Sequence, residues 1–278
     1  GFLRGIVGIF MFGIQTYFLS KAFGYLIRIC IFTIDQSLLD NEIFLTFFLS
    51  LNIIDWTSMF IAILIQFFLF SVGMVFNKSF IKFSAIAVYF GILLFFFSVF
   101  LKDVNFTSEI FITSLSYNNF IDINNLLPLI TVAGTIFAYF SIVILTFGDF
   151  SRYIKNEKEL KKGNLSLILN LIIFSFFALF IVVSADGFLN QNSENLSRIL
   201  TNPTDIIGSL NNLLITILVL IFIIIASAST NLIASFIPSQ YALINFSPSS
   251  LNFKKASYII TLFGFLVAIF WLIYFSQI

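Results

Sequence analysis

Long runs of apolar residues divide this sequence, and each run is long enough to cross a lipid bilayer as a helix. About 20 apolar residues span the hydrocarbon core, and the runs predict seven helices in a single transmembrane domain over 1–278. In lipid every backbone polar group has to be satisfied within the protein, which favours α-helices. The predicted fold class is therefore an all-α membrane protein. The predicted helices are 5–27, 57–77, 80–101, 128–148, 165–185, 209–236 and 256–276.

The composition supports a lipid environment and excludes several kinds of chemistry. Charged residues make up only 10% of the chain, whereas soluble domains carry about 25%. The chain has no histidine and one cysteine, Cys30, which excludes a Cys/His zinc site, a Ser-His-Asp triad and an internal disulfide. The apolar runs also hold no pair of carboxylates for acid–base catalysis. We therefore predict that the protein is not an enzyme and uses no cofactor.

Positive charge sets the predicted orientation, because cytoplasmic loops of membrane proteins retain Lys and Arg. Placing 149–164 in the cytoplasm puts ten of the 14 Lys and Arg residues inside and four outside. The first helix then runs from inside to outside across an inner or plasma membrane. The cytoplasmic set is Arg4, Lys78, Lys82, Arg152, Lys155, Lys158, Lys161, Lys162, Lys254 and Lys255.

Polar residues inside a membrane are costly and usually face a bundle interior or a cavity. Gln15 of the first helix carries four hydrogen-bonding sites that lipid cannot satisfy, and Met11 lies one turn earlier on the same face. Gln15 therefore suggests either a ligand contact or a hydrogen bond that holds two helices together.

The sixth predicted helix carries the densest polar cluster. Ala226, Ser229 and Thr230 share one face, and Asn231 and Ser235 share another, so this helix needs partners on two sides. Two hydroxyls and a backbone carbonyl are hard oxygen ligands that suit a small cation. Composition alone favours the alternative, in which small residues pack against other helices and the hydroxyls bond to their own backbone.

The fourth predicted helix combines Gly134 with the aromatic residues Phe137, Tyr139 and Phe140. A glycine inside a membrane helix can mark a break that exposes backbone groups to a ligand. Flat aromatic rings can stack on a flat ligand, although aromatic residues are weak evidence in a chain with 41 phenylalanines.

Three motifs resemble those of the nucleobase–cation symporters, a family of permeases for cytosine, uracil, allantoin, hydantoins and related compounds. The opening helix runs from Arg4 through Met11 and Gly13 to Gln15, in the family's Arg, aromatic, Gly and Gln pattern. The segment Gly148–Lys155 resembles the family's Pro-Asp-Phe-Thr-Arg-Tyr turn. The third motif, Ser229-Thr230-Asn231 continuing to Phe253, is similar to the family's Ser-Thr-Asn helix end and the Asn-Leu-Ala-Pro segment beyond it.

The resemblance implies a fold and a place within it. Family members are twelve-helix transporters built on a five-plus-five inverted repeat of the leucine-transporter type, with broken first and sixth helices. This chain begins at Gly1 and ends at Ile278 beside apolar runs, so we expect a fragment that covers helices three to nine of twelve. Its fourth predicted helix corresponds to the sixth helix of that fold, and its sixth to the eighth.

The family's site residues are carried over with departures on the substrate side. The substrate-bonding glutamine falls on Gln15, the two stacking tryptophans fall on Met11 and Phe140, and the substrate-bonding asparagine falls on Ser235. Tyr139, beside Phe140, is added to this set. The sodium ligands fall on Ala226 (carbonyl), Ser229 and Thr230 (hydroxyls). Structural or gating roles are assigned to Gly134, Asp149, Arg152 and Asn231, with Arg152 beside Asp149 as a cytoplasmic anchor.

The resemblance therefore implies a secondary transporter that imports a small, flat, amide-bearing heterocycle, driven by Na⁺ or H⁺. The expected partners are that heterocycle and the lipid bilayer, with no nucleic acid, and we expect a monomer. The alternative from another class is a membrane subunit or channel without coupled transport. Nothing in the sequence repeats as a pore-lining charged ring, which argues against a selective channel.

Overall fold

The structure is a computed structural model that describes residues 2–45, 47–49, 51–101, 108, 112, 126–145, 147–151, 154–191, 203–208 and 212–276. Helices account for almost all of these residues, and the described part of the chain contains no β-strand beyond one isolated bridge. The main helices are α1 (Phe2–Ile34), α3 (Ile53–Ser71), α4 (Met74–Phe100), α7 (Leu126–Leu145), α8 (Phe147–Ser151), α9 (Glu157–Gln191), α10 (Pro203–Gly208), α11 (Leu213–Asn231), α12 (Ile237–Phe246) and α13 (Phe253–Ser276).

The predicted fold class is confirmed, and most of the predicted apolar runs are membrane-spanning candidates. Six described helical stretches are long and apolar enough to cross a bilayer. The remaining run, 128–148, forms α7 over most of its length. The total of seven spans stays a prediction. The six candidates are Phe2–Ile34, Ile53–Ser71, Val75–Phe100, Glu157–Ala185, Leu213–Phe246 and Phe253–Tyr274.

The boundary between the second and third predicted helices differs from the structure. The sequence pattern ends the second helix at residue 77, before Lys78, whereas α3 ends at Ser71 and α4 begins at Met74. Gly73 has a φ of +132°, a backbone conformation that residues other than glycine rarely adopt. The Asn77 side chain donates a 3.2 Å hydrogen bond to the Phe70 carbonyl and closes the turn. The chain therefore reverses at the glycine rather than at the charge.

The sixth predicted helix also continues further than expected. The apolar run ends at residue 236, whereas the helix continues through Pro238, although proline lacks an N–H and clashes with the preceding turn. In the structure a π-helical turn, η3 (Leu232–Phe236), joins α11 to α12 without a gap. The Ile237 N–H donates to the Leu232 carbonyl, five residues back, so the wider turn accommodates the proline. The continuous stretch runs to Phe246.

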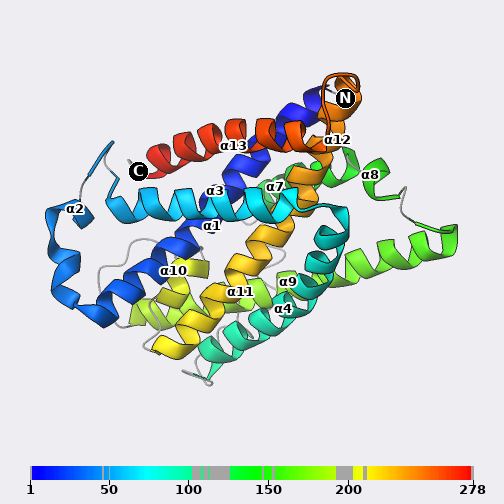
Figure 1. The fold of residues 1–278 in the computed structure, drawn as a ribbon. Helices are drawn as coiled ribbons and strands as arrows, with labels where there is room; N and C mark the ends of the chain where they lie inside the picture. Colours follow the sequence, from blue (N-terminus) through cyan, green and yellow to red (C-terminus); the bar gives the residue numbers. More distant parts are fainter. Residues whose placement is uncertain are drawn as a thin grey trace. The chain divides into compact units, whose positions relative to one another are not determined.

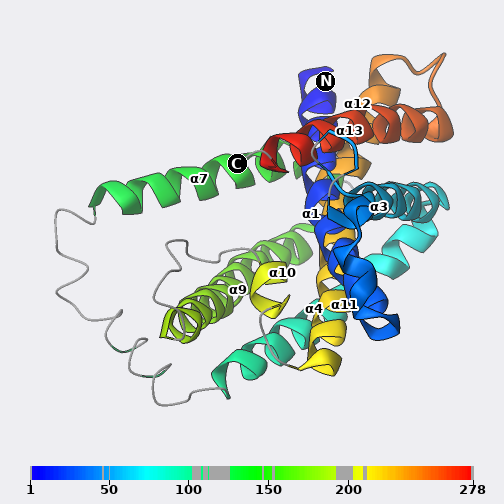
Figure 2. The same cartoon turned by 90° about the vertical axis from the view of Figure 1, so that its left-hand side faces the viewer.

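The structure divides into two compact units, and each is described by itself. The first unit comprises residues 1–91 and 216–278, with α1 in contact with α3, α12 and α13 (Figures 1 and 2). Its core contains three packed aromatic rings: the ring of Phe236 lies 5.6 Å from that of Phe12 and 5.1 Å from that of Phe70. All three side chains are fully buried. The polar residues of the candidate site on α1 and α11 belong to this unit.

Glycines allow α1 to approach its neighbours closely. A β-carbon at Gly13 would lie 2.6 Å from the Gly264 carbonyl of α13, and one at Gly8 would meet the Ser239 hydroxyl of α12. Small residues serve this purpose at helix interfaces in membranes, where dispersion contacts replace the hydrophobic effect. The glycines of the opening motif therefore set the packing of α1.

The second unit comprises residues 92–215 and is held by aromatic contacts between α4 and α9. The ring of Phe96 lies 5.2 Å from that of Phe177 and 4.7 Å from that of Phe180, and Phe100 lies 5.8 Å from Phe180. Such edge and tilted arrangements add to dispersion contact. Part of the phenylalanine content therefore builds interior contacts rather than only a lipid-facing surface.

Charged and capping groups mark the turn between α1 and α3. Arg28 and Asp55 form an ion pair with a nitrogen–oxygen distance of 3.4 Å, and Asn52 caps α3 by accepting a 2.8 Å hydrogen bond from the Asp55 N–H. Just beyond α1, the Asp35 carboxylate accepts hydrogen bonds from the Ser37 hydroxyl and the Ser37 N–H. These bonds, the first more than the second, hold the pKa of Asp35 below its usual value. These polar contacts stand where the chain leaves the apolar span.

Candidate functional site

The residues predicted to meet the substrate on α1 lie at the margin of its buried face. Met11 and Gln15 are both half-buried and stand four residues apart, so they share one side of the helix. The next positions round the helix, Phe12 and Thr16, are fully buried. The expected juxtaposition of Met11 and Gln15 is therefore present in the structure, while their contact with a substrate stays a prediction.

Asn231, assigned to a structural or gating role, anchors α11 to two other helices. Its side-chain amide donates to the Gln66 side-chain oxygen at 2.6 Å, the Phe12 carbonyl at 3.1 Å and the Thr16 hydroxyl at 3.3 Å. The Gln66 amide in turn donates to the Thr16 hydroxyl at 3.0 Å and to the Ala62 carbonyl at 3.2 Å. We call Thr16, Gln66 and Asn231 the polar triad.

The polar triad joins three helices, α1, α3 and α11, at a fully buried point. The relative exposure of each of its three residues is 0%. Buried polar groups without partners are costly, so hydrogen bonds between buried side chains of different helices favour one packing geometry. The triad therefore fixes the position of α11 immediately before the π-helical turn, and such turns occur often at functional sites.

A row of buried oxygen atoms follows the polar triad along the same helix. Asn231 Oδ1, Ser235 Oγ and Ser239 Oγ have no hydrogen-bond partner among the described residues, and all three side chains are fully buried. Ser235 lies inside the π-helical turn and is the position to which the substrate-bonding asparagine was carried over. Its hydroxyl therefore retains hydrogen-bonding capacity for a ligand or a water molecule, and its role in binding stays a prediction.

The three predicted cation ligands lie together in the last turn and a half of α11. Ser229 is buried, Ala226 is half-buried and Thr230 is exposed. The Ser229 hydroxyl donates a 3.0 Å hydrogen bond to the Ala226 carbonyl. A hydroxyl bonded to its own helix backbone was the alternative to cation binding in the sequence analysis. The described residues contain no group of three or more His, Cys, Asp or Glu that could hold a metal ion. A cation here would rely on neutral oxygen atoms, and its binding stays a prediction.

The remaining predicted residues belong to the second unit. Tyr139 and Phe140 lie in α7, but their side chains are outside the described part of the structure. Asp149 lies in α8, and Arg152 lies outside the described residues. The break considered at Gly134 is not found, because α7 runs through it as a continuous helix. A single glycine costs a helix only about 1 kcal/mol relative to alanine, so it does not by itself force a break.

Three polar residues of this region, Gln66, Thr16 and Ser239, were given no role by the sequence. Gln66 is the one polar residue within the apolar stretch 59–70, and an amide isolated in this way was a usable signal. Ser239 follows Pro238, beyond the expected end of the helix, and therefore lay outside the predicted span.

The fold and the buried polar groups define a multi-pass helical membrane protein with a polar interior. Comparison with known proteins places it more closely: the chain belongs to the family of permeases for cytosine/purines, uracil, thiamine and allantoin, which matches residues 1–277. This confirms the family resemblance and with it the five-plus-five inverted-repeat fold of the leucine-transporter type. It also favours a transporter over an enzyme.

One curated relative is a purine-uracil permease of Arabidopsis thaliana, 24% identical over 127 residues. The aligned part covers 46% of this chain and 20% of that relative. No solved structure matches the chain. The match therefore establishes the family but neither the substrate nor the coupling ion.

Proposed function

We propose that the full-length protein is a secondary active transporter that imports a small nucleobase-like heterocycle, of the cytosine, uracil, allantoin or hydantoin type, coupled to Na⁺ or H⁺. The family match over residues 1–277 carries this proposal. The named activity of the Arabidopsis relative, a purine-uracil permease, supports a ligand of this class. Residues 149–164 lie in the cytoplasm in the proposed orientation, and the protein acts as a monomer.

Substrate recognition is proposed to centre on Gln15. A carboxamide offers both a donor and an acceptor and therefore matches the amide edge of such a heterocycle. Phe140 stacks on the ring and Met11 fills the opposing wall, with Tyr139 and Ser235 completing the site. The residues at three of the four carried-over positions differ from the family's. We therefore expect the substrate, more than the reaction, to differ from that of other family members.

Cation coupling is proposed to use the carbonyl of Ala226 and the hydroxyls of Ser229 and Thr230. The structure supports this in part, since Thr230 is exposed and the two hydroxyls lie beside the position fixed by the polar triad. A cation bound there favours one conformational state and thereby couples ion binding to substrate binding.

Uptake assays with the full-length protein test the transport activity. Cells that express it are expected to accumulate at least one of radiolabelled uracil, cytosine, allantoin and hydantoin, and uptake is expected to rise with an inward Na⁺ or H⁺ gradient. Gln15→Ala is expected to abolish most of this uptake. Absence of uptake of all four compounds would remove the nucleobase class.

A Thr230→Ala variant tests the cation site. The Na⁺ concentration that gives half-maximal uptake is expected to rise about tenfold, within the range of typical coupling free energies. Thr57→Ala is the matched control, because Thr57 is also exposed and its hydroxyl bonds only to the Ile53 carbonyl of its own helix. An unchanged Na⁺ dependence in Thr230→Ala would contradict the assignment.

A further inference from the structure

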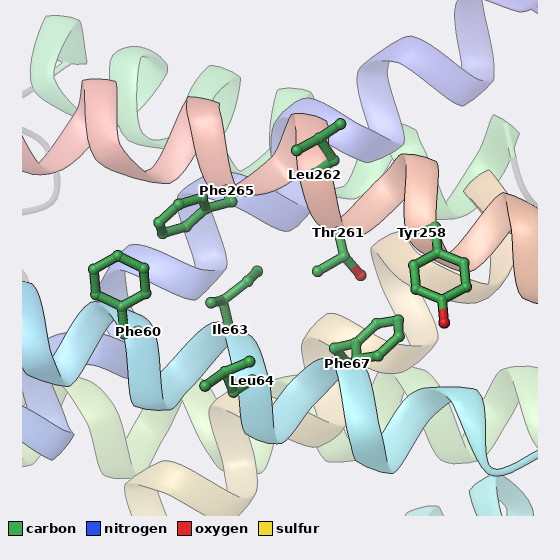
Figure 3. Close-up of a pocket in the computed structure, with 8 residues that line it drawn as sticks. All are labelled: Phe60, Ile63, Leu64, Phe67, Tyr258, Thr261, Leu262 and Phe265. Carbon is green, nitrogen blue, oxygen red and sulfur yellow. The ribbon is translucent and has the colours of Figure 1, made fainter.

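A groove of about 320 Å³ lies between α3 and α13 in the first unit (Figure 3). Aromatic pairs bridge the two helices at both of its ends. The rings of Phe60 and Phe265 lie 5.3 Å apart, and those of Phe67 and Tyr258 lie 5.1 Å apart. Each pair contributes one ring from each helix, so aromatic rings flank the groove at both ends.

The lining between the two aromatic pairs is almost entirely apolar. Ile63 lies at the bottom, with a relative exposure of 5%, whereas Leu64 and Leu262 are 51% and 60% exposed. Both helices qualify as membrane spans, so the rim of the groove faces either hydrocarbon or another protein surface. A second helix approaches closely where small residues line the contact, and these rim residues are large. The lining therefore fits a flexible hydrocarbon chain better than a helix.

Lys254 places a positive charge on the groove side of α13, one helical turn before Tyr258. Lys254 precedes Tyr258 by four residues and Phe265 by 11, which places the three on one face of the helix. Lys254 is exposed. Its neighbour Lys255 lies on another side and donates a 3.1 Å hydrogen bond to the Ser250 carbonyl. Lys254 is thus the lysine placed to meet a group at the groove's mouth.

The same end of the groove carries the features of a membrane interface. Lys254 belongs to the positively charged set that predicts the cytoplasmic side, where anionic lipids give the leaflet a negative surface potential. Tyr258 is 62% exposed, and tyrosine is enriched at the level of the lipid headgroups. The charge of Lys254 therefore suits a lipid phosphate, and the ring of Tyr258 suits the adjoining part of an acyl chain.

We propose that this groove is a binding site for one anionic phospholipid of the cytoplasmic leaflet. Its phosphate pairs with Lys254, and one acyl chain passes the Phe67–Tyr258 pair and lies over Ile63. Because the groove lies between α3 and α13, a bound lipid braces this helix pair on its outer side.

Native mass spectrometry of the purified full-length protein tests the headgroup contact. The protein, mixed with equal amounts of phosphatidylglycerol and phosphatidylcholine, is expected to retain one phosphatidylglycerol in preference. Lys254→Gln is expected to lower that preference about fivefold, the effect of one lysine near an anionic surface, and Lys255→Gln to leave it unchanged. Equal retention of the two lipids, or equal losses in the two variants, would overturn the proposal.

A second pair of variants tests the groove itself. Leu262→Trp places a large ring in the groove, whereas Leu266→Trp adds the same ring one turn later at a residue that is similarly exposed but does not line it. Only Leu262→Trp is expected to reduce retention. Phosphatidylglycerol with a photoreactive acyl chain is expected to label α3 and α13 in the wild type. A cross-link from these helices to another helix or to a second copy, with no lipid label, would show that protein fills the groove.

Discussion

Replacing Asn231 with alanine is expected to destabilise the full-length protein by about 2 kcal/mol. Single interhelical hydrogen bonds in membranes contribute about 0.6 kcal/mol on average. Asn231, however, donates to three acceptors on two helices. Its removal also leaves the Gln66 side-chain oxygen buried without that partner, at a further cost. The measurement is thermal unfolding of the purified protein in detergent.

Two further variants separate hydrogen bonding from volume. Asn231→Asp has nearly the same shape but lacks the amide donor, so it is expected to destabilise at least as much as alanine. Ser20→Ala removes another buried polar group, whose hydroxyl bonds only to the Tyr17 carbonyl of its own helix, and is expected to cost less than about 0.5 kcal/mol. Similar unfolding temperatures for Asn231→Ala and Ser20→Ala would contradict the proposed role of the polar triad.

Gln66 provides the test of coupling within the polar triad. If the two amides act as one unit, combining Gln66→Leu with Asn231→Leu is expected to cost less than the sum of the two single changes, because each single change already leaves the other amide without its main partner. Additive effects would show two independent contacts.

The sequence predicted elements and polar faces better than it predicted partners. Ser229 and Asn231 were placed on two faces that both need partners, and the structure pairs Asn231 with α1 and α3 while Ser229 bonds to its own helix. The partner Gln66 is 165 residues away in the chain, and no local pattern reports such a contact. Hydrophobic periodicity gives the buried face of a helix, whereas tertiary packing selects what covers it.

The two boundary differences have a common physical origin. Hydropathy indicated Lys78 as the interruption, but a lysine at a helix end can extend its chain towards the interface, and the backbone freedom of Gly73 decided the turn. The apolar run ended at residue 236, but the helix continues because a π-helical turn accommodates Pro238. Local signals of this kind show where the regular helix is disturbed, and the surrounding packing determines whether it ends there.

Replacing Gly13 with valine is expected to have the largest effect on folding, a destabilisation of about 3 kcal/mol or a loss of folded protein. A β-carbon at this position would lie 2.6 Å from both the Gly264 carbonyl and the Val267 β-carbon of α13. A backbone carbonyl cannot rotate away as a flexible side chain can, so α1 and α13 would have to separate. Loss of their contact would also open the buried Phe12–Phe236 core beside it.

The matched control for this change lies in the same helix. A β-carbon at Gly24 would lie 3.5 Å from the Ser58 hydroxyl, an ordinary van der Waals contact, so Gly24→Ala is expected to be neutral or slightly stabilising because alanine favours the helix. Gly13→Ala should fall between Gly24→Ala and Gly13→Val, because its single methyl already meets the carbonyl. Fluorescence-detected size-exclusion chromatography after stepwise heating of the full-length protein measures all three. Gly13→Val with the unfolding temperature of the wild type would show that α1 and α13 do not pack at this glycine, since no rotation of the valine side chain removes the contact of its β-carbon.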